Sequence, residues 1–152
     1  MRTVFRYWLW LMALAVIVQI GFAGIGAFDA ADKATAGSVD EDGFYDSFTL
    51  HAALGTFLVL GGLLTFLLAL AARVGRKRVL HALGIFGLLI VQMLLGWTGQ
   101  DLPEVLGFLH PINAILILGA VASLASQEWR GDRMAPHRGS GETMSPPPAT
   151  AA

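Results

Sequence analysis

Four long apolar runs constrain this sequence more than any other feature. They cover residues 7–27, 48–72, 79–98 and 103–127, and polar segments separate them. A helix needs about 20 residues to cross roughly 30 Å of hydrocarbon. Helices also satisfy every backbone hydrogen bond internally where lipid offers no partner. The runs therefore predict an all-α, polytopic membrane four-helix bundle.

Composition agrees with this class and divides the chain into two parts. Hydrophobic residues make up 55% of the chain and charged residues 14%. Residues 1–130 form the predicted four-transmembrane-helix domain. Residues 131–152 are rich in Pro, Ser, Gly and Ala, which predicts a disordered cytoplasmic tail. The absence of cysteine from the sequence excludes disulfides, thiolate metal sites and redox thiols.

The charge distribution predicts how the chain lies in the membrane. Nine of the ten Lys and Arg residues fall at the N-terminus, in loop 73–78 and in segment 130–138. Segment 28–46 carries six acidic residues against Lys33 alone. Basic loops stay cytoplasmic, so we predict a multi-pass protein of the plasma (inner) membrane with both termini cytoplasmic. The first run is longer than a usual signal-peptide core and no small-x-small cleavage site follows it, so we interpret it as a retained helix.

An internal repeat relates the two halves of the chain. Segments "IVQIGFAGIG" (17–26) and "IVQMLLGWTG" (90–99) share their Ile-Val-Gln opening and closing Gly. Each is followed by a helix that opens with histidine, "HAALG" at His51 and "HPINA" at His110. Chance likeness between apolar segments is the alternative. The matched Gln and His favour two pseudo-symmetric helical hairpins, related by an axis along the membrane normal.

The two repeat histidines are predicted to lie at one depth. At 1.5 Å per residue, His51 and His110 both lie roughly 30 Å from the basic boundaries at Arg73 and Arg130. His81 lies at the opposite, basic boundary without a partner at its level, so we interpret it as interfacial. A histidine within a membrane helix marks a candidate functional site.

Two facing imidazoles favour a planar metal cofactor. Neutral histidine is the commonest metal ligand, and a bare zinc or copper ion would need more protein ligands than this pair supplies. Haem supplies the other four ligands itself and is held between helices of a bundle. We therefore predict one haem b per chain. The candidate residues are the iron ligands His51 and His110, with Gly55, Gly107, Gln19, Gln92 and Asn113 as further cofactor-binding residues.

The His110–Pro111 pair sits inside the fourth run. Proline leaves the carbonyl of Gly107 without its helical partner, which predicts a helix from about Pro103 with a kink at Pro111. Asn113 is then placed to hydrogen-bond a freed carbonyl or a cofactor edge. The alternative is that "HP" marks a helix start and has no ligand role.

The segment "RVLHALGIFGLLIVQMLLGWTGQDLPEVLGFLHPINAILILG" (78–119) resembles one half of a haem A synthase. That family is similar in having four-helix halves with a histidine early in the second and fourth helices. It also shows Gln followed by Leu-Gly in the third helix, here Gln92, Leu95 and Gly96. The resemblance implies that His51 and His110 are the paired axial ligands of one haem near the outer face.

The chain departs from the haem A synthase pattern just before its first histidine, and this departure bears on which half of that family it is more similar to. The family's catalytic half has a glutamate one turn before its first histidine, whereas here the nearest carboxylate is Asp46, five residues before His51. The chain is more similar to the half that carries haem b as an electron-transfer centre.

The sequence thus predicts an integral membrane haem b protein for electron transfer or haem handling near the outer face, and it assigns no enzymatic activity. The rival is a cofactor-free membrane assembly or structural subunit in which the histidines and glutamines join helices. A transporter is disfavoured because no acidic residue lies mid-membrane. Expected partners are the lipid bilayer and either a second copy (a homodimer) or other membrane redox subunits, with no nucleic acid.

Overall fold

The computed structural model describes residues 1–37, 40–98 and 103–133, and these residues contain helices and no strand. The predicted all-α class is confirmed. Four of the helices are long and apolar enough to cross a membrane. The helices are α1 (Arg2–Thr35), α2 (Glu41–Ser47), α3 (Thr49–Ala71), α4 (Arg76–Thr98) and α5 (Pro103–Arg133).

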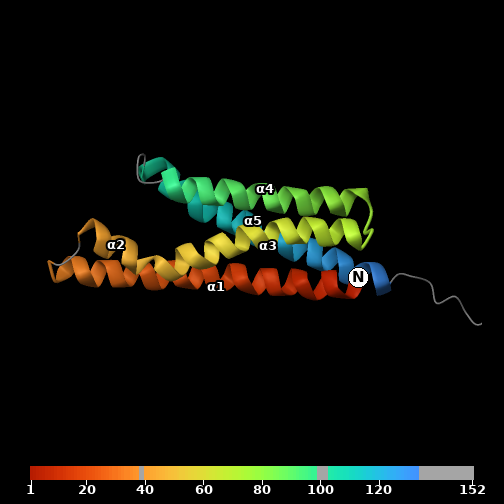
Figure 1. Ribbon diagram of the computed structural model, residues 1–152, viewed down its shortest axis with the longest axis horizontal. Coiled ribbons are helices and arrows are strands. Elements are labelled where there is room, and N and C mark those ends of the chain that lie inside the picture. Colours follow the sequence, from red (N-terminus) through yellow and green to blue (C-terminus); the bar gives the residue numbers. More distant parts are fainter. Residues whose placement is uncertain (38–39, 99–102, 134–152) are drawn as a thin grey trace, which may run out of the picture.

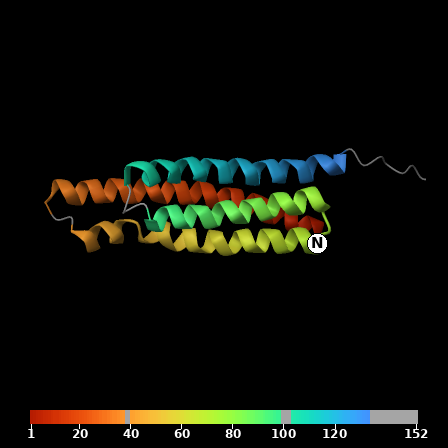
Figure 2. The same ribbon diagram turned by 90° about the horizontal axis from the view of Figure 1, so that it is seen from above.

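The four long helices form an up-and-down bundle (Figures 1 and 2). Helix α1 packs against α3 and α5, and α4 packs against the same two helices. The diagonal pairs are therefore α1 with α4 and α3 with α5. We call the end where α3 and α5 begin the histidine end, and the opposite end, which holds the N-terminus and the α3–α4 turn, the basic end.

Helix α1 is longer than the sequence predicts. It continues past the expected end at Ala27 to Thr35, and its last turns carry an Asp29–Lys33 ion pair at 2.7 Å, spaced i,i+4. Such pairs and the alanines of this stretch favour helix. Segment 28–46, which the sequence predicts as a loop, is therefore largely helical in its described residues.

Helix α2 folds back onto the extension of α1. Its N-cap Asp40 accepts a hydrogen bond from the backbone N–H of Gly43 at 2.8 Å, and Lys33 donates to the hydroxyl of Ser47 at 3.0 Å. Gly26 permits close contact here, since a Cβ at that position would lie 2.7 Å from the carbonyl oxygen of Ser47. The short helix is thereby held over the histidine end.

The remaining helix bounds lie close to the predicted ones. Helix α5 begins at Pro103 and runs without interruption through Pro111 to Arg133, past the expected end at residue 127. The turn between α3 and α4 uses left-handed backbone at Gly75, with φ of 94°. The first three residues of the predicted disordered tail, 131–133, are instead the end of α5. The outer turn at 99–102 and the rest of the tail, from 134 onward, lie outside the described residues.

The hydrophobic core lies toward the basic end. Here the indole N–H of Trp8 donates to the hydroxyl of Thr65 at 2.9 Å, and the guanidinium of Arg78 pairs with the buried carboxylate of Glu128 at 2.7 Å. Few apolar side chains near the histidines are buried to the same degree. The core cluster consists of Phe5, Leu9, Met12, Ala13, Val16, Leu58, Ala69, Ala72, Val74, Ala82, Ile85, Leu89, Ile117, Val121, Leu124 and Ala125.

Candidate functional site

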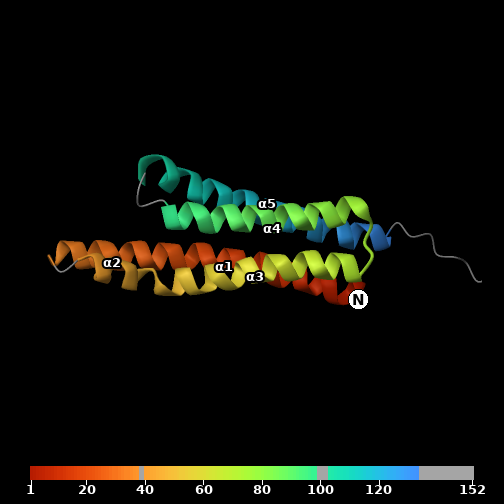
Figure 3. The same ribbon diagram turned by 45° about the horizontal axis from the view of Figure 1, so that its top comes forward.

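An apolar cavity of about 790 Å³ occupies the histidine end of the bundle. It lies between the α1–α3 hairpin and the α4–α5 hairpin, which form separate pairs at this end (Figures 1 and 3). Small-molecule and cofactor sites span about 300–1,000 Å³, so the volume fits a cofactor-sized ligand. The apolar lining includes Val16, Ile20, Phe48, Leu58, Leu89 and Met93.

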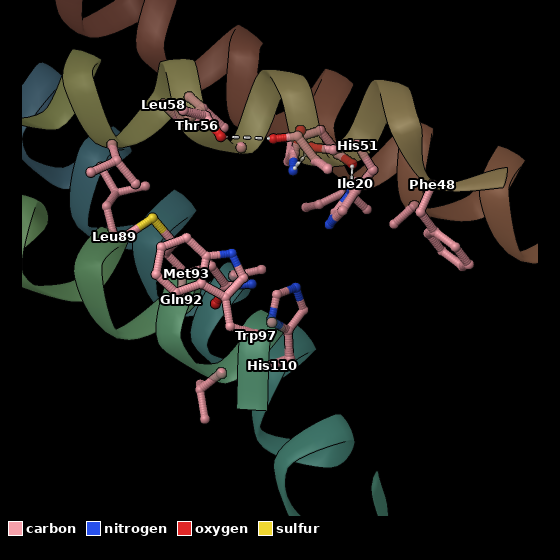
Figure 4. A pocket seen from close by; sticks show the side chains of 18 of the residues that line it. Ile20, Phe48, His51, Thr56, Leu58, Leu89, Gln92, Met93, Trp97 and His110 are labelled. Atoms are coloured by element: carbon pink, nitrogen blue, oxygen red, sulfur yellow. Dashed lines mark hydrogen bonds between the residues drawn. The ribbon is translucent and has the colours of Figure 1, made fainter. Parts of the chain in front are cut away.

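His51 and His110 meet across this cavity (Figure 4). They come from diagonally opposite helices, and their ring centroids are 6.0 Å apart with an angle of 55° between the ring planes. Two metal–imidazole bonds of about 2 Å, with each centroid about 1 Å behind its ligating nitrogen, separate the centroids by about 6 Å. The pair thus has the spacing that one shared metal centre requires.

His51 is held by two hydrogen bonds to Gln19 of α1. Its Nδ1 lies 3.1 Å from the backbone carbonyl oxygen of Gln19, and the side-chain amide of Gln19 donates to the backbone carbonyl of His51 at 2.8 Å. A carbonyl oxygen only accepts, so this contact places the proton on Nδ1 and leaves Nε2 free to act as a ligand. Metal-binding histidines usually have such a partner for their second nitrogen.

His110 is positioned differently. Its Nδ1 is buried and has no hydrogen-bond partner, although the backbone of Gln92 lies nearby. The ring faces Gly96 of α4, where an added Cβ would lie 3.4 Å from Cε1 of His110. The pseudo-symmetric halves therefore place both rings in one cavity and support them unequally.

Gln92 and Asn113 hydrogen-bond to each other. The amide of Asn113 donates to Oε1 of Gln92 at 2.8 Å and to the backbone carbonyl of Leu88 at 2.9 Å. The amide nitrogen of Asn113 thus donates to α4 and not to the carbonyl freed by Pro111. Gln92 lines the cavity and Asn113 does not. Asn113 joins α4 to α5 behind the site.

The donor set of the site is the two imidazoles. Within the described ranges, no group of three or more His, Cys, Asp or Glu residues could hold a metal ion. The described residues that line the cavity carry no Asp, Glu, Lys or Arg. Such a lining suits an apolar ligand that brings its own metal and its remaining ligands.

One protein family matches the chain over residues 19–99, just over half of its length, and is described as "Family of unknown function (DUF6220)". The chain belongs to this family. The matched segment contains Gln19, His51 and Gln92 and ends before His110. No curated protein and no solved structure matches the chain.

The glycines of the site in this DUF6220 protein have separate roles. A Cβ at Gly55 would lie 3.0 Å from Nε2 of Gln19, so Gly55 makes room for the amide that holds His51. A Cβ at Gly107 would meet nothing within 4 Å, although Gly107 lines the cavity. Gly107 therefore leaves open space one turn before His110.

Sequence reasoning did not find the aromatic wall that α2 adds to the site. Phe44, Tyr45 and Phe48 all line the cavity, and the ring of Phe48 contacts His51 edge-on at a centroid distance of 6.3 Å. The signal was present as three aromatic residues within the acidic segment 28–46 and its continuation to Phe48. Aromatic residues at that density favour a packed segment over a solvated loop.

Proposed function

We propose that this DUF6220 protein binds one haem b between His51 and His110, with both imidazoles as axial ligands. The observation that carries the proposal is the 6.0 Å separation of the two rings across an apolar cavity of about 790 Å³. The resemblance of the chain, over about residues 7–130, to one half of a haem A synthase supports the same ligand pair. The basic end, by its Arg and Lys residues, belongs in the cytoplasm, so the cofactor lies toward the outer face of the plasma membrane.

Each residue of the site has a defined task in this proposal. His51 and His110 hold the iron, and the Gln19 carbonyl orients His51. Gly107 and Ala114 leave the cavity open beside His110, while Gln92 and Asn113 fix the neighbouring α4–α5 contact. Bis-histidine haem supplies one-electron redox chemistry. The protein's role is then electron transfer or haem handling, with a second copy or another membrane redox subunit as partner.

A cofactor-free structural subunit is the second candidate, and one observation favours it. The Gln19–His51 and Asn113–Gln92 hydrogen bonds link helices without any ligand, as polar groups do in many membrane bundles. The cavity between the two rings has no role in that reading. It favours the haem proposal.

Visible spectroscopy of the purified protein separates the two candidates. The protein is produced with ample haem and its spectrum recorded before and after dithionite, for the wild type and for His51→Ala, His110→Ala and His81→Ala. We expect sharp reduced bands in the wild type and in His81→Ala, since His81 lies outside the cavity. We expect those low-spin bands to disappear in the other two variants. A colourless wild type, or bands that survive both cavity substitutions, would refute the haem proposal.

A further inference from the structure

The two proposed ligands differ in how firmly the protein holds them. His51 is joined to Gln19 at both its ring and its backbone carbonyl. His110 lacks the side-chain contact, and its buried Nδ1 makes no well-formed hydrogen bond, although the backbone of Gln92 lies beside it. Partners of this kind commonly change metal affinity by about 10–100-fold. The difference is therefore large enough to set the order in which the two histidines release a metal.

The side-chain part of the difference corresponds to a single position in the repeat. Gln92 corresponds to Gln19, but its side-chain oxygen accepts from Asn113 and is drawn into the α4–α5 contact. The residue three positions after His51, which corresponds to Asn113, is Leu54, which has no amide to offer. Gln19 donates its amide to the backbone of His51, whereas the Gln92 side chain is held against Asn113 through its oxygen.

The space around the two rings differs in the same direction. Beside His51, the room that Gly55 provides is filled by the amide of Gln19 at 3.0 Å from an added Cβ. Beside His110, an added Cβ at Gly107 would meet nothing within 4 Å. The turn before His110 accordingly leaves room for a small molecule, while the ring itself lies against Gly96.

We propose that His51 is the permanent ligand and His110 the exchangeable one, so that a small neutral ligand can replace His110 at the iron. Suitable ligands are a diatomic gas or a free imidazole, and the exchange breaks the bond from His110 to the metal and forms one to the incoming molecule. Asn113 is the positioning residue that keeps His110 exchangeable, because it holds the Gln92 side chain at the α4–α5 contact. This inference rests on the haem proposal above.

Chemical rescue of the two histidine variants tests the inference. His110→Ala and His51→Ala are purified with haem, and haem content and spin state are measured with and without millimolar imidazole. We expect His110→Ala to retain haem in a high-spin form that imidazole converts to low-spin, and His51→Ala to retain at least tenfold less haem, with no rescue. Equal haem content in the two variants, or the reverse order, would overturn the inference while leaving the haem proposal intact. A wild type that binds no haem defeats both.

Carbon monoxide provides a second test that does not depend on the folding of the histidine variants. We expect the reduced wild-type protein to take up carbon monoxide and to exchange its bis-histidine bands for those of a carbon-monoxide complex. In Asn113→Leu, which copies Leu54 and releases the Gln92 amide, uptake should be at least tenfold slower. If the haem-loaded wild-type protein binds no carbon monoxide at a saturating concentration, His110 is not an exchangeable ligand. Equal uptake rates in the two proteins contradict the role given to Asn113.

Discussion

The two ends of the bundle are built from the same kinds of apolar residue, but one end is tightly packed and the other encloses a cavity. At the basic end, apolar side chains from all four long helices interdigitate and a buried ion pair links α4 to α5. At the histidine end, residues of the same apolar character surround a cavity of about 790 Å³. Apolar side chains gain little free energy by moving from lipid into a helix interface, so membrane helices associate through close packing. A cavity kept open between such helices is a feature that a ligand explains.

The difference between the two ends predicts that stability and ligand binding respond to different substitutions. Substitutions at the basic end should change the stability of the bundle and leave ligand binding intact. Substitutions around the cavity should do the reverse. Four variants test this division.

Leu9→Ala should destabilise the bundle most. Leu9 is fully buried at the basic end, and we expect a loss of about 2 kcal/mol, the low end of the range for buried leucines, because only packing is lost in a membrane bundle. The matched change Leu95→Ala, in the wall of the cavity, should cost less than about 0.5 kcal/mol. Reversible unfolding in detergent, followed by circular dichroism, measures both. Equal costs would show that the two ends are packed alike.

Arg78→Ala should have the next largest effect. Glu128 is 1% exposed and its carboxylate accepts from Arg78 at 2.7 Å. Removing the cation leaves a buried charge, and we expect a cost of about 1–2 kcal/mol, less than for a fully buried pair because Arg78 is itself partly exposed. The double variant Arg78→Ala with Glu128→Gln should recover part of the loss. No recovery in the double variant would show that the pair is not the cause.

Gly107→Phe should fill part of the cavity and so block haem binding without unfolding the protein. A side chain added at Gly107 enters open space beside His110, so we expect haem affinity to fall at least tenfold, or about 1.4 kcal/mol. Gly119→Phe is the control, because Gly119 lies on the same helix, also has open space around it and does not line the cavity. Equal haem affinity in the two variants would place the ligand elsewhere.

Thr65→Val should have the smallest effect. It removes the hydrogen bond from Trp8 at the basic end while keeping the shape of the side chain. Interhelical hydrogen bonds in membrane proteins are worth about 0.6 kcal/mol on average, and we expect a loss of that size with unchanged haem affinity. A change in haem affinity would show that the two ends are coupled.

The sequence was sufficient to predict the helices and the pair of histidines because both leave periodic, local signals. Span length predicts the four long helices, and the repeat brings His51 and His110 to one level. The extension of α1 to Thr35 was not predicted, since acidic residues there suggested a loop while the Asp29–Lys33 pair and alanines favour helix. The unequal support of the two rings also escaped the sequence. Its side-chain part depends on where the Gln92 side chain finds its partner, and the packing of α4 against α5 brings that side chain to Asn113.

Titration of haem into the haem-free protein tests the joint role of the two histidines most directly. Absorbance and electron paramagnetic resonance are followed as haem is added in detergent. The 6.0 Å spacing of the rings predicts saturation at one haem per chain with a six-coordinate, low-spin signal. Absence of saturable binding, or a bound haem that stays five-coordinate and high-spin, would contradict a cofactor shared between His51 and His110.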